Sequence, residues 1–195
     1  GTLQAIMGDL RVSELVNNSL TISNNGGLFA AGHDLIMEIV GSSTLKPELS
    51  VLGGVLEAGN LTQFNAGDGH LKIDVQDMGG NVSVSAGTLA LKVNEGTNPF
   101  NIVHMNVTGD PDVDVTAPSY TSPFENTFGG HVNVVATAGN ISIGNIDTTN
   151  AGVGSAAGFV NLQATGSIGT GSIVTGHAAG ASGAVTLNAG TTIST

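Results

Sequence analysis

The ten residues Val82-Ser-Val-Ser-Ala-Gly-Thr-Leu-Ala-Leu91 decide the fold of this chain. Apolar residues alternate with small neighbours on both sides of a central Ala-Gly step, and a period of two is typical of a strand with one buried face. Glycine tolerates the backbone of a tight corner. The segment therefore predicts two short strands joined by a corner.

The same pattern recurs along the chain, as at Val132–Ala136, Val160–Ala164 and Val185–Ala189. Gly-Gly pairs begin at residues 26, 53, 79 and 129, and an Ala-Gly or Thr-Gly step has its glycine at residues 32, 59, 87, 139, 166 and 190. Most of these intervals are 24 to 28 residues, and one interval in each series is about double. Self-similarity at this period is typical of a repeat architecture. We interpret the doubled interval as one degenerate copy.

Short strands in a repeat of about 26 residues predict an all-β fold, a right-handed parallel β-helix (β-solenoid) with roughly seven to eight coils. We expect one domain over residues 1–195, with a short N-terminal helix over residues 4–16 as an alternative for that segment. Equivalent apolar residues should form ladders inside the coil. One predicted ladder is Val84, Val134, Leu162 and Leu187, and the other is Leu61, Leu89, Ile141, Ile168 and Ile193.

A Pro-rich segment at about residues 99–128 interrupts the pattern. Four of the five prolines lie in it, and proline cannot donate a hydrogen bond to a central strand ladder. We therefore expect an irregular excursion from the solenoid wall. Loops on a rigid scaffold often carry binding residues, which makes Tyr120 and Phe124 binding-loop candidates. The alternative is a flap whose Phe side chains cover the coil.

Composition restricts the function. The net charge is −11, with four Lys and Arg residues against fifteen acids, and this balance repels nucleic acid. The chain has no cysteine, hence no disulfide or thiolate metal site, and no apolar stretch reaches the roughly 18 residues of a membrane span. Since the chain starts at Gly1 without Met and stops partway round a coil, we expect a piece of a longer precursor or a docking subunit.

Few groups of residues in the sequence suggest metal binding or catalysis. Asp110, Asp112 and Asp114 alternate along one face of an extended segment, and clustered carboxylates can bind calcium, although solvated surface acids are the simpler interpretation. We expect no other metal and no cofactor. Acid pairs for a glycosidase would be Asp74 with Asp77, or Asp112 with Asp114. The turn Gly67-Asp-Gly-His70 is similar to a polygalacturonase histidine turn, but the partner motifs of that family do not follow, and we expect no enzymatic activity.

The C-terminal portion also resembles a known family. The runs Gly130-His-Val-Asn-Val-Val-Ala-Thr-Ala-Gly-Asn-Ile-Ser-Ile-Gly-Asn-Ile146 and Gly158-Phe-Val-Asn-Leu-Gln-Ala-Thr-Gly-Ser-Ile-Gly-Thr-Gly-Ser-Ile173 resemble the repeats of filamentous-haemagglutinin-type adhesins. The resemblance is close from Gly130 onward and loose before Glu125. It implies a right-handed β-helix exported across the outer membrane, with a role in adhesion or scaffolding.

These observations together predict a non-enzymatic extracellular or cell-surface β-helix that acts as an adhesin shaft or scaffold. Its partners would be flanking coils, further copies of itself, or a glycan or protein on a host surface. The first alternative is a self-assembling filament subunit that stacks end to end, because only Asp147 is charged after Glu125. The second alternative is a carbohydrate-binding module.

Overall fold

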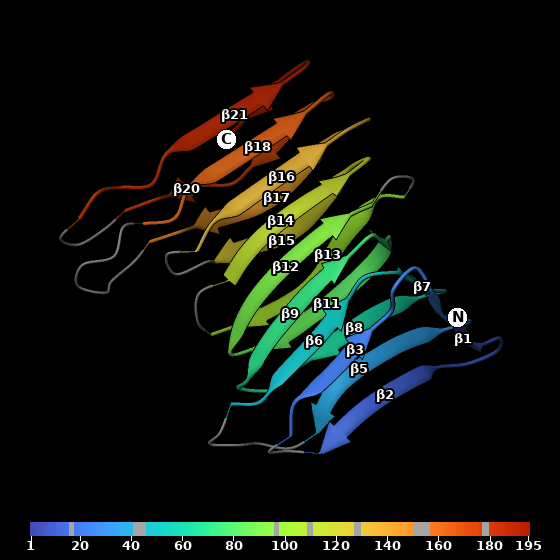
Figure 1. Ribbon diagram of the computed structural model, residues 1–195. Coiled ribbons are helices and arrows are strands. Elements are labelled where there is room, and N and C mark those ends of the chain that lie inside the picture. Colours follow the sequence, from blue (N-terminus) through green and yellow to red (C-terminus); the bar gives the residue numbers. More distant parts are fainter. Residues whose placement is uncertain are drawn as a thin grey trace.

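The computed structural model describes residues 1–15, 18–40, 46–95, 98–108, 111–126, 130–149, 157–176 and 180–195. Over these residues the chain forms strands and connections only, and every strand pair is parallel. The strands stack in rising ladders from β2 (Leu10–Leu15) at one end to β21 (Val185–Ala189) at the other (Figure 1). The predicted parallel β-solenoid is confirmed.

The strands form three sheets. Sheet A contains β1 (Thr2–Ala5), β4 (Leu28–Ala31), β7 (Val55–Ala58) and β10 (Asp77–Met78). Sheet B contains β2, β5 (Asp34–Val40), β8 (Leu61–Asn65), β11 (Gly80–Ala86), β13 (Phe100–Val107), β15 (Tyr120–Asn126), β17 (Ile141–Asp147), β19 (Ile168–Thr170), β20 (Ile173–Val174) and β22 (Ile193–Ser194). Sheet C contains β3 (Leu20–Ser23), β6 (Glu48–Leu52), β9 (His70–Val75), β12 (Thr88–Asn94), β14 (Pro111–Ala117), β16 (Val132–Ala136), β18 (Val160–Ala164) and β21.

The cross-section of the solenoid changes along its axis. The first laps visit sheets A, B and C in turn, so the N-terminal part is three-sided. The last strand of sheet A, β10, has two residues, and from there on the described chain alternates between sheets B and C. The successive strands of sheet C and of sheet B correspond to the seven to eight coils expected from the sequence.

The length of a lap varies along the axis. In the three-sided part, the hydrogen-bonded side chains of Asp34 and Asn60 on neighbouring laps are 26 residues apart. In the middle, Asp114 and its partner Asn133 are 19 residues apart, because these laps shorten or omit the sheet A strand. Asn133 and its next partner, Asn161, are 28 residues apart, since a longer connection joins β17 to β18. The laps near both ends of the described chain are therefore longer than those in the middle.

The doubled glycine interval has a different cause from the one we inferred. Gly59 and Gly139 both precede strands of sheet B, β8 and β17, and four laps separate those strands. The stretch from Gly59 to Gly139 thus makes four short laps, not three laps with a degenerate copy. Gly87 precedes β12 of sheet C, so it marks another corner of the coil and does not belong to the same series.

The predicted ladders are correct within the C-terminal laps. Val134, Leu162 and Leu187 are Cα partners on successive strands of sheet C. The ladder continues backwards through Val115, Val93 and Val75. Val84 was assigned to it wrongly, because it lies in β11 of sheet B.

The second ladder divides in the same way. Ile141, Ile168 and Ile193 are successive partners in sheet B. Leu89 lies in sheet C, and Leu61 pairs with Asn81, one position out of step. Both errors arise because one constant period was carried across the shorter laps in the middle of the chain.

The predicted Pro-rich excursion over residues 99–128 is wrong. Strands β13, β14 and β15 of this segment lie in the wall and pair with laps on either side. Pro99 and Pro118 lie in corners, where their carbonyls accept hydrogen bonds from Gly80 N (2.9 Å) and Ala138 N (3.2 Å). Pro111 is the first residue of β14, a position that does not require an N–H donor.

Tyr120 is therefore not a binding-loop residue. Its side chain is 1% exposed and stacks on Phe100 inside the coil, with ring centroids 5.9 Å apart. Phe124 belongs to β15, but its side chain lies outside the described residues. The alternative N-terminal helix is also wrong, since β1 and β2 occupy that segment. A search of the described residues finds no helix with the length and apolarity to cross a membrane.

Candidate functional site: a polar groove on sheet C

A row of polar side chains crosses the outer face of sheet C. Its members are Cα partners on five successive strands, β9, β12, β14, β16 and β18, and they alternate with the buried ladder residues. They therefore point away from the core. We call them the sheet C row: Asp74, Lys92, Asp114, Asn133 and Asn161.

Hydrogen bonds connect this row in two parts, Asp74 with Lys92, and Asp114 with Asn133 and Asn161. Lys92 Nζ donates to Asp74 Oδ2 at 3.3 Å, and Asn133 Nδ2 donates to Asp114 Oδ1 at 2.9 Å. Asn161 Nδ2 donates in turn to Asn133 Oδ1 at 2.8 Å. Because a carboxamide both donates and accepts, asparagine can continue such a chain across the sheet. The row thus carries alternating donors and acceptors on one line.

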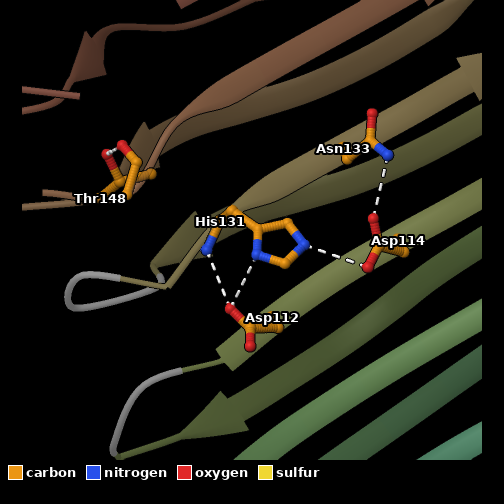
Figure 2. A network of polar contacts seen from close by, with 6 residues as sticks. Asp112, Asp114, His131, Asn133 and Thr148 are labelled. Atoms are coloured by element: carbon orange, nitrogen blue, oxygen red, sulfur yellow. Dashed lines mark hydrogen bonds and ion pairs between the residues drawn. The ribbon is translucent and has the colours of Figure 1, made fainter. Parts of the chain in front are cut away.

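His131 closes one side of the row, between two aspartates (Figure 2). Its Nδ1 lies 3.0 Å from Asp112 Oδ1, and its Nε2 lies 3.0 Å from Asp114 Oδ2. The backbone N–H of His131 also donates to Asp112 Oδ1 at 3.1 Å. Both ring nitrogens of His131 thus lie within hydrogen-bonding distance of a carboxylate oxygen.

The aromatic ring of Phe159 lies beside the histidine. The His131 ring stacks on Phe159, with centroids 4.8 Å apart and planes 9° apart, and Phe159 is 44% exposed. The chain before Phe159 is anchored by Thr148, whose Oγ1 donates to Gly158 O at 2.8 Å and whose carbonyl accepts Gly158 N at 3.3 Å. Phe159 is therefore held beside His131 on a fixed backbone.

Two adjoining hollows lie along this surface. The smaller, about 200 Å³, lies over Ala90, the short side chain between Lys72 and Asp112 in register. The larger hollow has a volume of about 570 Å³, and the residues that line it include Val93 and Val115. Both hollows share three lining residues of the row, Asp74, Lys92 and Asp114. We call the combined surface the sheet C groove.

The calcium candidates have a mixed outcome. Asp112 and Asp114 come together around His131, and Asp110 lies outside the described residues. Oxygens of both described aspartates already accept hydrogen bonds from His131 and, for Asp114, from Asn133. The interpretation of these residues as solvated acids stays a prediction, with calcium binding as the alternative.

Sequence analysis did not predict the role of His131. The signal was present: His131 follows Asp112 by 19 residues, and Asn133 follows Asp114 by the same number. A constant longer period hides this relation because it aligns the aspartates with other residues.

The acid pair Asp74 and Asp77 does not face one groove. Asp74 lies on β9 in sheet C and Asp77 on β10 in sheet A, with a corner between them. His70, from the Gly-Asp-Gly-His turn, instead forms a hydrogen bond through Nδ1 to Thr88 Oγ1 at 2.6 Å.

A second acidic cluster lies where sheet A ends. Glu95 is 1% exposed and accepts a hydrogen bond from Asn98 N at 2.7 Å. Hydrogen bonding to Glu95, burial, and repulsion from Glu95 and Glu57 raise the pKa of Asp77 to about 6. A hollow of about 550 Å³ lies beside Asp77 and Glu57. Two carboxyl groups held this close favour sharing a proton.

A third cluster consists of Asp9 and His33, in the corners before β2 and β5, and of Asp34, the first residue of β5. Its ligand-type atoms lie within 4.8 Å of one another, so the three side chains could hold a metal ion. The contacts within the cluster already satisfy these atoms, since Asp9 Oδ1 accepts Asp34 N at 3.1 Å and contacts His33 Nδ1 at 3.0 Å. The Asp34 N–H and the His33 ring hold the pKa of Asp9 below its usual value.

Comparisons with protein-family models, curated proteins and solved structures found no match to this chain.

Proposed function

We propose that this protein is a non-enzymatic scaffold of the cell surface or the extracellular space, an adhesin shaft that presents the sheet C groove to its surroundings. The observation that carries the proposal is the continuous interior. In sheet C, apolar ladder residues follow one another from β9 to β21, and the parallel strands of each lap hydrogen-bond to the next. A structure of this kind resists bending and projects a surface away from its anchor.

The face of sheet C supports the same proposal. Its outward side chains are fixed by hydrogen bonds to neighbouring laps, so the row is ordered before any partner arrives. Preorganised side chains lose less conformational entropy on binding. The resemblance of the C-terminal repeats to adhesin repeats agrees with this proposal and with a secreted location.

The filament subunit is the second candidate, and exposed apolar residues on the last strands favour it. Val185 of β21 and Ile193 of β22 are 46% and 49% exposed. The changing cross-section argues against simple stacking, however. The first laps have three sheets and the last described laps have two, so successive laps do not repeat one cross-section along the axis.

Assembly state separates the two candidates. Purified protein is examined by light scattering and negative-stain electron microscopy over a hundredfold range of concentration. The shaft proposal expects single rods at every concentration, and fibres that lengthen with concentration would favour the filament. Beads coated with the protein are then tested for adherence to cultured cells, with beads carrying heat-denatured protein as the control. Rods whose beads adhere no better than the control would contradict the adhesin role.

A further inference from the structure

We propose that the sheet C groove is a binding site for an uncharged oligosaccharide. The inference rests on the proposed scaffold function and names the class of ligand that the scaffold would present itself to. The site is centred on the hollow over Ala90 and extends along the row toward Asn133 and Phe159.

Hydrogen-bonding capacity is the first argument. A sugar hydroxyl both donates and accepts, so it is best matched by a surface that offers both roles at short intervals. Along the row, Asp74 accepts, Lys92 donates, and Asp114 accepts. The amide of Asn133 then does both. Parallel strands place successive members of the row about 4.8 Å apart, a regular spacing that suits a ligand with a repeating unit.

The hollow supplies a place for a ring. Ala90 lies between Lys72 and Asp112, and its single methyl group leaves a depression of about 200 Å³ among longer side chains. Lys92 and His131 border the same depression. Ligand sites generally combine an apolar floor with a few polar groups at the rim, and this depression has both.

The aromatic pair provides the apolar face. Phe159 is 44% exposed although its ring is stacked on His131 and its backbone is anchored through Gly158. His131 covers one face of this ring, and the part that stays exposed extends the apolar surface beside the row, where it can contact the C–H groups of a sugar. The same ring would be of no use to a small inorganic ion.

Charge selects among carbohydrates. Acids and bases nearly balance in the groove, where Asp74, Asp112 and Asp114 lie beside two lysines and one histidine. The repulsion of polyanions such as uronic acid polymers or sulfated glycans comes instead from the chain as a whole, whose net charge is −11. Neutral hexose and N-acetylhexosamine oligomers are therefore the expected ligands.

The test uses the full chain on an array of neutral and anionic oligosaccharides, followed by isothermal titration with cellotetraose and chitotetraose. We expect binding to neutral glycans, with a Kd of about 1 mM or tighter for at least one of the two oligomers. No binding to any neutral glycan, or binding restricted to the anionic glycans, would overturn the proposal. Single rods that adhere to cells without binding sugar would leave the scaffold function intact and remove this inference alone.

Two variants locate the site. Ala90→Gln fills the hollow from an exposed position, and we expect it to weaken binding by at least about tenfold. Thr121→Gln, at an exposed outward position on β15 of sheet B, is the matched control and should leave the affinity unchanged. Phe159→Ala provides a second probe at a different point of the groove, with the same expected loss. Each variant is checked by circular dichroism, and equal affinity in wild type, Ala90→Gln and Phe159→Ala would refute the location.

Discussion

Replacing Asp77 by Asn should make this protein more stable at neutral pH. The change acts on the carboxyl pair at the end of sheet A, where hydrogen bonding to Glu95, burial and the negative charges of Glu95 and Glu57 raise the pKa of Asp77 from 3.8 to about 6. A carboxyl group whose pKa is raised by folding binds its proton more tightly in the folded state. Stability from this group is therefore fully present below about pH 4 and is lost as the pH rises to about 6.

The magnitude follows from the pKa. A rise from 3.8 to about 6 corresponds to a loss of at most about 3 kcal/mol above pH 6. Asp77 is partly exposed, so solvent screening reduces this loss of stability, and we expect a loss of about 1 to 2 kcal/mol. An Asn at this position stays neutral and can donate its amide N–H to Glu95 at every pH. The variant should gain about 2 to 4 °C in Tm per kcal/mol at pH 8.

The assay is thermal unfolding followed by circular dichroism at pH 4, 5, 6, 7 and 8. Wild type should lose stability between pH 4 and pH 6, whereas Asp77→Asn should show a flatter profile and match wild type at pH 4. Glu57→Gln is the first control, and it should give a smaller gain because Glu57 makes the least of the four contributions to the pKa of Asp77. Asp74→Asn is the second control, because Asp74 lies in sheet C and pairs with Lys92. A variant less stable than wild type at pH 8 would refute the reasoning.

Three further predictions test the core, the corners and the calcium candidates. Leu162→Ala removes a fully buried ladder side chain and should lower the free energy of unfolding by about 2 to 5 kcal/mol, measured by urea denaturation. Gly59→Ala should lower Tm by several degrees because its Cβ would lie 2.2 Å from a backbone oxygen of the lap below. Gly169→Ala, with open space around the added carbon, should change Tm by no more than about 1 °C. Calcium at millimolar concentration should leave Tm unchanged, since donors already occupy Asp112 and Asp114; a rise that Asp112→Asn abolishes would contradict this.

The strands could be predicted from the sequence because their signal is local. Alternation in Val132–Ala136 and Val160–Ala164 reflects one buried and one solvated face, and both segments are strands of sheet C. The corners were also visible, as at Gly59, where a close backbone approach excludes a side chain. These features depend on a few neighbouring residues.

The lap length could not be predicted in the same way, because it depends on how many sheets a lap visits and on how long the connections between them are. A strand of sheet A lengthens a lap without changing the alternation on either side of it. The pairing of Asp114 with Asn133 and the burial of Tyr120 both follow from the short laps in the middle of the chain. The prolines of this segment moved Tyr120 from the core to a supposed loop, although Pro99 and Pro118 lie in corners, and an overestimate of the period concealed the groove.

The end of sheet A explains why a carboxyl pair with one buried member, Glu95, exists beside the apolar interior. A strand that stops being extended by the next lap leaves an edge, and polar groups near that edge need partners. The backbone N–H groups of Gln76 and Asp77 donate hydrogen bonds to Gly54 O on the preceding lap, at 3.1 and 3.3 Å. On the lap above, Glu95 takes the place of a strand residue and accepts Asn98 N. The carboxyl side chain thus supports the backbone at the point where a sheet is lost, and the proton that Asp77 retains up to about pH 6 reduces the cost of placing a second acid beside it.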